Sequence, residues 1–476
     1  MGSQKIKGAE RLQQVKDRDI EETLIEYIMN THFDDLPERA IEIGKALVLT
    51  SLGTIVAGAK SEGCEAVLEQ VREWSGREEA TILMHGGRVP AHNASFVNGM
   101  MARALDFCDG MVPGMHLGST CVPAGLAVAE LTGGCSGKDF LTYLVVGAEV
   151  ASRINSCSTY KGYTFKPTGV CAIFAASAIA GKLLNLDAKQ MLNALALAFN
   201  RSGGSFQSNL DGALAVRVVQ GFASQGGIIC AQLAKRGITG PKNFLKGQYG
   251  YFHLFGDDTY DTELLLGEWK KRFALTKAQF KRYPTCWNNT SSIDAMLTLV
   301  REKDITVEDV ERVSVTITPH EYRLVGHPFK AGDNLRVDAQ FSVQYSVANA
   351  LVRKDFRLEH FDEPAIREPK VMEFIDRIDV TADPELQKQG RNAAVVRVKT
   401  KNGVMYEETV LSPRGRPENP LTREDHIEHF NHCFTYGGRS LPSENAERIL
   451  SMVTQLEELP DVRALIPLLV SQKPRH

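Results

Sequence analysis

The sequence predicts a two-part fold, in which an all-helical part comes first and an α+β part follows. Small and apolar residues recur with helical spacing through most of residues 21–236, which is typical of closely packed helices. Strand patterns appear only after Trp269. Residues 313–318 alternate between apolar and polar, and residues 394–400 meet 404–410 across Asn402-Gly403, a strong hairpin signal. A chain of 476 residues is also long enough for two cores.

The expected helices of the first part can be taken in order. Residues 21–29 and 40–59 have a helical pattern, and a shorter helix runs to a polar break at residues 75–77. The next helix spans 95–105, because Phe96, Met100 and Ala104 recur on one face. It should stop near Asp109, and Pro123 is expected to open the following helix.

Further helices are expected at 139–156, 169–184, 188–200 and 221–236. Asp187 supplies an N-cap for the third of these. Helices return from Leu421 onward, with Ser443 as the N-cap of a helix at 446–456 and a final apolar segment at 464–470. We therefore divide the chain into a helical domain (1–268), an α+β domain (269–420) and C-terminal helices (421–476).

One stretch, residues 94–130, carries the strongest indication of chemistry. Asp106 and His116 flank a loop whose uncharged part, residues 111–115, contains Pro113 and Gly114. A histidine near a helix N-terminus is favoured in its neutral form, which suits a proton acceptor, and Asp106 is placed to orient it or to hold a substrate hydroxyl. The alternative is that Asp106 caps a turn and that the backbone satisfies His116.

Composition excludes several classes of protein. The formal net charge is only −3, and no basic run with interleaved aromatic residues indicates a nucleic-acid surface. The nine cysteines are scattered and odd in number, as in a reduced cytoplasmic protein without a disulfide frame or zinc site. The first ten residues lack an apolar signal sequence, and the least charged stretch, 110–129, is a poor membrane span. No nucleotide-binding loop is indicated.

Several short motifs, in a shared order, resemble the MmgE/PrpD family along nearly the whole chain. The first combines Phe96-Val-Asn-Gly99, Ala104-Leu-Asp-Phe107 and His116. The others are Phe165-Lys-Pro-Thr-Gly169, Lys281-Arg-Tyr-Pro284, Phe341-Ser-Val-Gln-Tyr345 and Pro417-Glu-Asn-Pro-Leu-Thr422.

The resemblance implies a fold and a class of reaction. The α+β part would be a lid inserted into the helical domain, the C-terminal helices would pack back on that domain, and two copies would form a homodimer through it. The family includes 2-methylcitrate dehydratases, cis-aconitate decarboxylases and iminodisuccinate epimerases. These enzymes act on a carbon next to a carboxylate of a small di- or tricarboxylate, so the site needs cations, an acid or base, and exclusion of water.

The resemblance also implies roles for individual residues. His116 and Asp106 match the acid/base region, and Lys281 matches a lid lysine, with Arg282 as a competing candidate. Tyr322 falls where a family tyrosine reaches the site, in a loop that also holds His320. For these lysine, arginine and tyrosine side chains the alternative is a surface cation or a packing residue.

Four positions depart from the family pattern. Gly110 replaces a Thr or Ser, and Lys166 stands where cis-aconitate decarboxylases have a His. Val216 replaces a lysine, and the neighbouring Arg217 would stay charged and could only grip a carboxylate. Thr290 replaces a further His.

We expect a cofactor-independent lyase of the dehydratase type. In it Lys166, Arg217 and Lys281 hold carboxylates, while His116 moves a proton. An epimerase, isomerase or decarboxylase is the alternative among enzymes, and a non-catalytic carboxylate-binding protein is the alternative from another class. A helix carrying His426, His429 and His432 is interpreted as a solvated face and not as a metal site.

Overall fold

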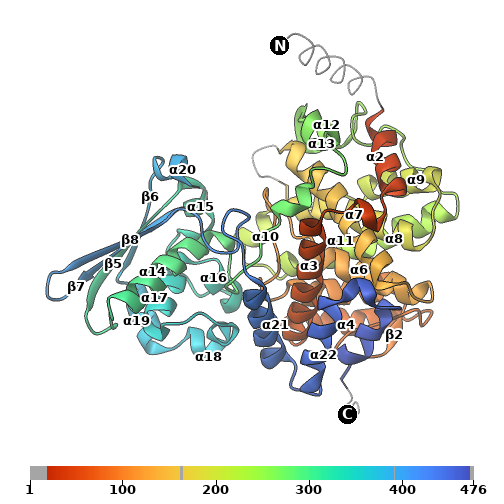
Figure 1. Cartoon of the computed structure of the whole chain (residues 1–476). Coiled ribbons are helices and arrows are strands. Elements are labelled where there is room, and N and C mark those ends of the chain that lie inside the picture. The colour runs from red at the N-terminus through yellow and green to blue at the C-terminus, as the bar shows by residue number, and fades with distance from the viewer. Residues whose placement is uncertain (1–18, 161–164, 391, 472–476) are drawn as a thin grey trace, which may run out of the picture.

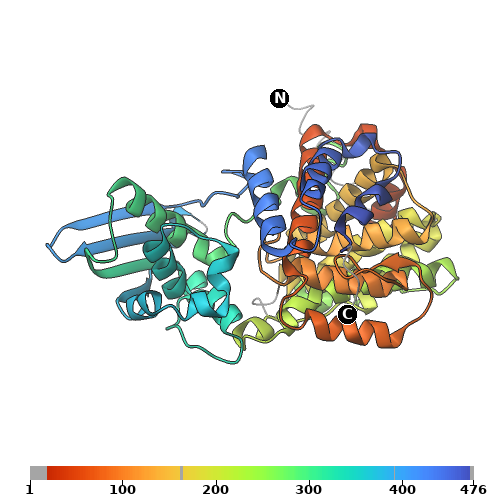
Figure 2. The same ribbon diagram turned by 90° about the horizontal axis from the view of Figure 1, so that it is seen from below.

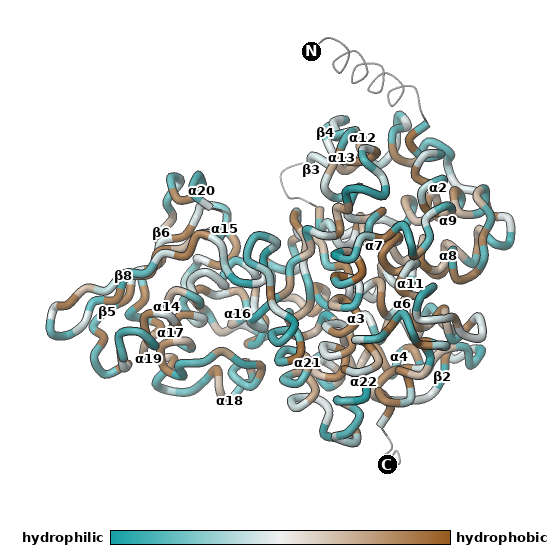
Figure 3. Tube along the Cα trace, viewed as in Figure 1, coloured by the Kyte–Doolittle hydropathy of each residue, from teal (hydrophilic) through white to brown (hydrophobic). Residues whose placement is uncertain are grey.

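The computed structural model describes residues 19–160, 165–390 and 392–471, and it has two lobes of unequal size (Figure 1). The first ten residues, on which the argument about a signal sequence depends, lie outside the described residues. Hydrophobic residues concentrate along the inner helices of the large lobe and along the sheet of the small lobe, whereas the peripheral loops are hydrophilic (Figure 3). Each lobe has its own buried core.

The large lobe is a bundle of helices, but it is not all-helical as predicted, because it also contains two short two-stranded sheets, β1-β2 and β3-β4. Helices α5 and α11 pack against each other at its centre, with α8 and α9 against α11 and α3 against α5. Its elements are α2 (Ile20–Asn30), α3 (Glu38–Gly58), α4 (Cys64–Trp74), β1 (Ala80–Thr81), β2 (Arg88–Val89), α5 (Ala91–Arg103), α6 (Gly118–Leu131), α7 (Gly137–Cys157), β3 (Ser158–Tyr160), the π-helix η2 (Thr168–Ala172), α8 (Ile173–Leu183), α9 (Ala188–Asn200), α10 (Gln207–Leu210), α11 (Ala215–Lys235), α12 (Tyr251–Phe255), β4 (Gly256–Tyr260) and α13 (Thr262–Leu266).

Two helices begin five or more residues earlier than the sequence predicts. Helix α6 begins at Gly118, five residues before Pro123, because the Asp109 carboxylate accepts the free N–H groups at its start. Helix α11 begins at Ala215 and runs through Gly221. A Cβ at Gly221 would lie 2.5 Å from the Phe96 carbonyl oxygen, so this glycine allows α5 and α11 to approach closely and does not mark a helix start.

The small lobe is a four-stranded sheet covered on one face by helices. The strand order is β6-β5-β7-β8, and the β5–β6 pair is parallel whereas the other two pairs are antiparallel. Gly403 adopts φ +86° in the predicted hairpin turn. The elements are α14 (Thr290–Glu302), β5 (Val310–Ile317), α15 (Pro319–Val325), α16 (Leu335–Gln340), α17 (Val343–Arg353), α18 (Glu363–Ile366), α19 (Pro369–Ile375), β6 (Ile378–Ala382), α20 (Leu386–Gln389), β7 (Ala394–Thr400) and β8 (Met405–Val410).

The chain then returns to the large lobe through α21 (Arg423–Gly437), α22 (Glu444–Thr454) and the 3-10 helix η7 (Val462–Leu469). Figure 2 shows α21 lying beside α3 at the boundary between the two lobes. Ser443 stands at the N-cap position of α22, but its side chain makes no capping bond. Helix α3 alone, among the described helices, is long and apolar enough to span a membrane, and 83% of its apolar window is buried inside the bundle.

Candidate active site

A cavity of about 610 Å³ lies between the two lobes, a size typical of small-molecule sites. The large lobe contributes the loop between α5 and α6, Lys166 and α10. The small lobe contributes the segment around Trp287 and one face of α15. The titratable side chains that line the cavity are Arg103, Asp106, His116, Lys166, Lys281, Cys286, His320, Glu321, Arg323, His327 and Arg416.

His116 lies in this cavity just before α6 and is held by two backbone contacts. Its ring Nδ1 is 2.6 Å from the Asp109 carbonyl oxygen, and its backbone N–H donates to the Thr168 hydroxyl at 3.0 Å. Since a carbonyl oxygen only accepts, Nδ1 carries the proton and Nε2 keeps the lone pair. Burial lowers the pKa of His116 well below its usual range, and Arg103 and Lys281 lower it further. His116 is therefore a neutral base at pH 7.

Asp109 fixes both the helix and the histidine, and the sequence reasoning missed this role. Its carboxylate accepts from the N–H groups of Leu117 at 2.8 Å and Gly118 at 2.9 Å, and its carbonyl oxygen orients the His116 ring. Burial raises the pKa of Asp109 to about 6, against the lowering effect of these backbone donors. The signal available in the sequence was the position of Asp109, eight and nine residues before the N–H groups of Leu117 and Gly118 that it accepts from.

Asp106 does not orient His116 but forms the centre of a buried ion cluster. Its Oδ1 lies 2.5 Å from Arg103 Nη1 and 2.7 Å from Lys281 Nζ, and Lys281 also donates to the Asp106 carbonyl oxygen at 2.9 Å. Burial acts to raise the pKa of Asp106, but Arg103 and Lys281 outweigh it and the pKa is lowered. The cluster therefore carries one negative and two positive charges, and its net positive charge suits a carboxylate ligand.

Lys166 lies in the cavity wall, with 2% of its surface exposed. Its Nζ donates to the Asn209 side-chain oxygen and to the Val216 carbonyl oxygen, both at 3.3 Å. Burial, together with the nearby charge of Arg103, lowers the pKa of Lys166 to about 7. At neutral pH this amine is present in both protonation states, as a group that donates or accepts protons requires.

Three predicted site residues lie outside the lining of this cavity. Arg217 is buried on α11, where it donates to the Glu62 carbonyl oxygen at 3.0 Å and lies 3.6 Å from the Glu62 carboxylate. Arg282 lines a different cavity and lies 3.9 Å from Asp294. Tyr322 packs against the core of the small lobe, because the face of α15 that lines the main cavity carries His320 and Arg323 instead.

The two cysteines nearest the ion cluster are not activated. Burial raises the pKa of Cys108 and of Cys286 to about 11, so both are neutral thiols at pH 7. All nine cysteines of the chain lie in its described part, and each is a free thiol.

The histidines of α21 do not form the solvated face that the sequence suggested. His429 is buried with its Nε2 2.9 Å from the Phe107 carbonyl oxygen, and His432 pairs with Glu359 at 3.0 Å. His426 lies edge-on to the Phe280 ring. Within residues 19–160, 165–390 and 392–471, no group of three or more His, Cys, Asp or Glu side chains is arranged to hold a metal ion.

Models of two protein-family domains match most of the chain. The MmgE/PrpD N-terminal domain model matches residues 22–263, and the MmgE/PrpD C-terminal domain model matches residues 283–458. The chain belongs to the MmgE/PrpD family. The cavity therefore lies where the two matched regions meet, because residues from both line it.

The chain is similar over nearly its full length to MmgE/PrpD enzymes of two activities. It is 25% identical to the cis-aconitate decarboxylase of Homo sapiens over 92% of both chains. The identity is 24% to the cis-aconitate decarboxylase of Aspergillus terreus, over 92% of this chain and 94% of that one. The identity is 22% to the 2-methylcitrate dehydratase of Escherichia coli O157:H7, over 93% of this chain and 95% of that one. The protein is thus an enzyme of the MmgE/PrpD type.

The structure leaves no room for a side chain at Gly110, where the resemblance led us to expect a Thr or Ser. A Cβ at this position would lie 2.6 Å from Trp287 Nε1, which is closer than any stable contact. The Gly110 backbone is fixed by a pair of hydrogen bonds with Gln279, at 2.8 and 2.7 Å, so it has little room to move away. The indole therefore occupies the space in which a Thr or Ser side chain would lie.

Adding a side chain at residue 110 is expected to damage the site even if it restores the hydroxyl. We expect Gly110→Ala to lower kcat/KM roughly tenfold, because displacement of Trp287 disturbs the cavity wall and small misplacements are costly in catalysis. Trp287→Phe removes the atom that the new Cβ would meet, so Gly110→Ala should cost less in that background. A double-mutant cycle of kcat/KM measures this coupling, and simple additivity would contradict the proposed contact.

Proposed function

We propose that this enzyme is a lyase that removes water from a small tricarboxylate-like acid, by taking a proton from the carbon next to a carboxylate. The observation that carries the proposal is the pairing of a neutral buried base with a buried amine of pKa about 7 in one cavity, beside a cationic cluster. Dehydration requires a proton acceptor for the C–H proton and a proton donor for the leaving hydroxyl, and this cavity holds a candidate for each.

The first step is assigned to His116. Its Nε2 takes the proton from the carbon, and the electron pair of that C–H bond moves toward the adjacent carboxylate. The Asp106–Lys281–Arg103 cluster stabilises the negative charge that develops there, since its net charge is positive and the groups are already fixed in place. Hydrogen bonding of Nδ1 to Asp109 keeps the ring in the reactive tautomer.

The second step is assigned to Lys166 in its ammonium form. As the electron pair forms the carbon–carbon double bond, the C–O bond to the hydroxyl breaks and Lys166 donates the proton that releases it as water. The resulting neutral amine is acceptable in this buried position because burial already favours that form. The acid and base thus end in the opposite protonation states and are reset by solvent.

Decarboxylation is the second candidate, because two of the three relatives described above are cis-aconitate decarboxylases. In that reaction the C–C bond to the carboxylate breaks, carbon dioxide leaves and the carbanion is protonated. Lys166 would again supply the proton, whereas no base would be required. The presence of His116 as an unprotonated base favours dehydration over this alternative.

Product analysis separates these reactions. The purified enzyme is incubated with citrate-like, aconitate-like and methylcitrate-like acids, and carbon dioxide release and new olefin are measured together. Olefin without carbon dioxide supports dehydration, and carbon dioxide supports decarboxylation. Binding of these acids without any turnover would overturn both and favour a carboxylate-binding protein without catalysis.

The small lobe is proposed to act as a lid over the cavity. His320, Trp287 and Cys286 reach the cavity from the small lobe, whereas His116 and Lys166 belong to the large lobe. A substrate between these groups would draw the lobes together, exclude water and strengthen the electrostatic contacts.

We also propose a homodimer formed through α4 and α11. Phe222 is 54% exposed and stacks on Phe96, which in turn stacks on Trp74, itself 51% exposed. Leu233 lies three turns along α11 from Phe222, on the same face, and is also exposed. Such a patch is typical of a protein interface. Phe222→Glu should convert a dimer to a monomer in light scattering, and an unchanged mass would contradict this interface.

A further inference from the structure

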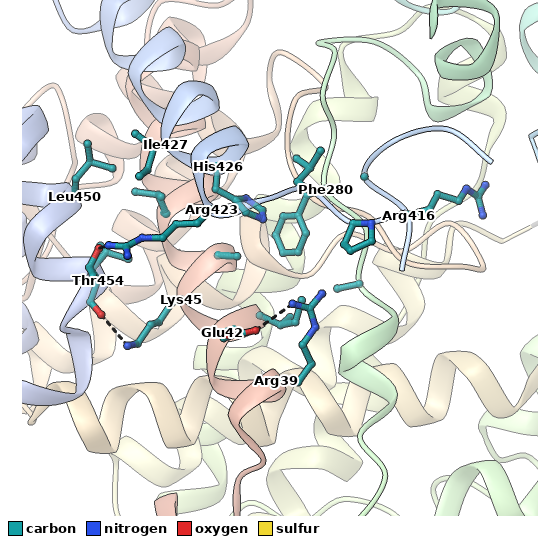
Figure 4. Close-up of a pocket in the computed structure, with 18 residues that line it drawn as sticks. Arg39, Glu42, Lys45, Phe280, Arg416, Arg423, His426, Ile427, Leu450 and Thr454 are labelled. Carbon is teal, nitrogen blue, oxygen red and sulfur yellow. Dashed lines mark hydrogen bonds and ion pairs between the residues drawn. The ribbon is translucent and has the colours of Figure 1, made fainter. Parts of the chain in front are cut away.

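A second cavity, of about 470 Å³, lies in the large lobe between α3, α21 and α22 (Figure 4). Phe280 and residues 415–421 form its remaining wall. The proposed lyase reaction does not use this second cavity. Apolar side chains form most of its inner surface: Ile43, Leu49, Phe280, Leu421, Ile427, Leu450 and Val453. A cavity of this size holds a small organic molecule.

Basic side chains surround this apolar interior, and most of them are already neutralised. Arg39 lies 3.1 Å from Glu42, and Lys45 lies 2.6 Å from Glu457 and donates to the Thr454 carbonyl oxygen at 2.7 Å. Arg423 is different, because it donates a hydrogen bond of 3.4 Å to the Thr454 hydroxyl and makes no ion pair with any carboxylate of the described residues.

Two further polar side chains line this cavity, those of His426 and Arg416. His426 is held neutral at pH 7, because burial lowers its pKa to about 4 despite the opposing effect of Asp425. Arg416 lines both cavities, and its side chain extends away from Arg39 and His426 (Figure 4). The guanidinium of Arg423 therefore lies at the edge of an apolar cavity without an ion-pair partner among the described residues.

We propose that this cavity binds a medium-chain monocarboxylate, with its alkyl chain inside and its carboxylate at Arg423. One uncompensated cation calls for one anion, and bidentate pairing of guanidinium with carboxylate is favourable. The apolar wall explains why the ligand is not a second molecule of the polar substrate, since a tricarboxylate would leave charged groups against Leu49, Ile427 and Val453.

The position of the cavity makes its occupant relevant to the active site. The Phe280 N–H donates to the Gly415 carbonyl oxygen at 2.9 Å, and the residues that follow each of these, Lys281 and Arg416, line the catalytic cavity. An alkyl chain packed on the Phe280 ring therefore lies one residue from the lysine that pairs with Asp106. The two cavities share this wall.

Calorimetric titration of the full-length protein with octanoate tests the proposal. We expect octanoate to bind at least tenfold more tightly than butyrate, which has a shorter chain, and at least tenfold more tightly than octanamide, which lacks the charge. His116→Ala should bind octanoate like the wild type, so this test is independent of the proposed lyase activity. Absence of octanoate binding at millimolar concentration would overturn the proposal.

A charge reversal locates the binding site. Arg423→Glu should weaken octanoate binding at least tenfold, and it should fold normally because Arg423 is exposed and acidic residues are favoured in the first turn of a helix. Arg448→Glu is the matched control, since Arg448 is exposed on α22 and does not line the cavity. Equal binding by both variants, or loss of binding only in Lys281→Ala, would overturn the assignment.

Discussion

Replacement of His116 by Gln is expected to lower kcat at least a thousandfold while leaving the fold intact. Gln can still donate to the Asp109 carbonyl oxygen, so the loop before α6 should be kept, but its side chain has no basic nitrogen to replace Nε2. General base catalysis contributes roughly 10²–10⁴-fold, and the base is required for the first step of the proposed dehydration. Steady-state kinetics on the identified substrate measure this effect.

His85→Gln is the matched control for this variant. His85 is also a partly buried histidine with its Nε2 3.0 Å from a backbone carbonyl oxygen, that of Ala59, and burial lowers its pKa. It does not line the catalytic cavity. We expect its variant to keep nearly full activity. If His116→Gln lost less than tenfold, the assignment of the base would be wrong.

The second large effect concerns position 216, where the resemblance to the family places a lysine in many of its members. Here that position is Val216, but the Lys166 ammonium lies 3.3 Å from the Val216 carbonyl oxygen, so a cation is present at nearly the same place from a different part of the chain. We expect Lys166→Ala to lower kcat roughly 100-fold or more, through loss of the proton donor. Adding Val216→Lys to this variant should recover part of the activity, because it returns an amine to the same region.

The dependence of kcat/KM on pH should show in which protonation state Lys166 acts. Lys166 acts as the ammonium, and its pKa of about 7 means that kcat/KM should fall as the pH rises through 7. This limb should disappear in Lys166→Ala. Lys182→Met is the control, because burial lowers the pKa of Lys182 as it does that of Lys166, but Lys182 lies outside the cavity. A profile that instead rises through pH 7 would assign Lys166 the role of a base.

Elements set by local signals could be predicted closely from the sequence. Helix α9 spans Ala188–Asn200 with Asp187 as its cap, and strand β7 spans Ala394–Thr400 before the Asn402-Gly403 turn, as expected. The start of α6 could not be placed, because it depends on the Asp109 carboxylate, which reaches it only in the folded loop. Local patterns carry no information about such contacts.

Several residues of the candidate site could be named from the sequence, but their contacts with one another could not. Motif resemblance identified His116, Lys166 and Lys281, which all line one cavity. It missed Arg103, because an arginine near a helix end has many surface roles and only the fold brings it to Asp106. Arg217 was assigned to substrate because it follows Val216, but adjacent residues of a helix point in different directions.

Hydrogen exchange at the substrate tests the central claim most directly. Proton NMR in deuterated water follows the C–H next to the carboxylate of the acid that the enzyme turns over, for the wild type and for His116→Gln. We predict that the wild type forms olefinic product and incorporates deuterium at that carbon in residual substrate, and that His116→Gln does neither. Wild-type product formation with the C–H bond intact, or undiminished exchange in His116→Gln, would contradict proton abstraction by His116.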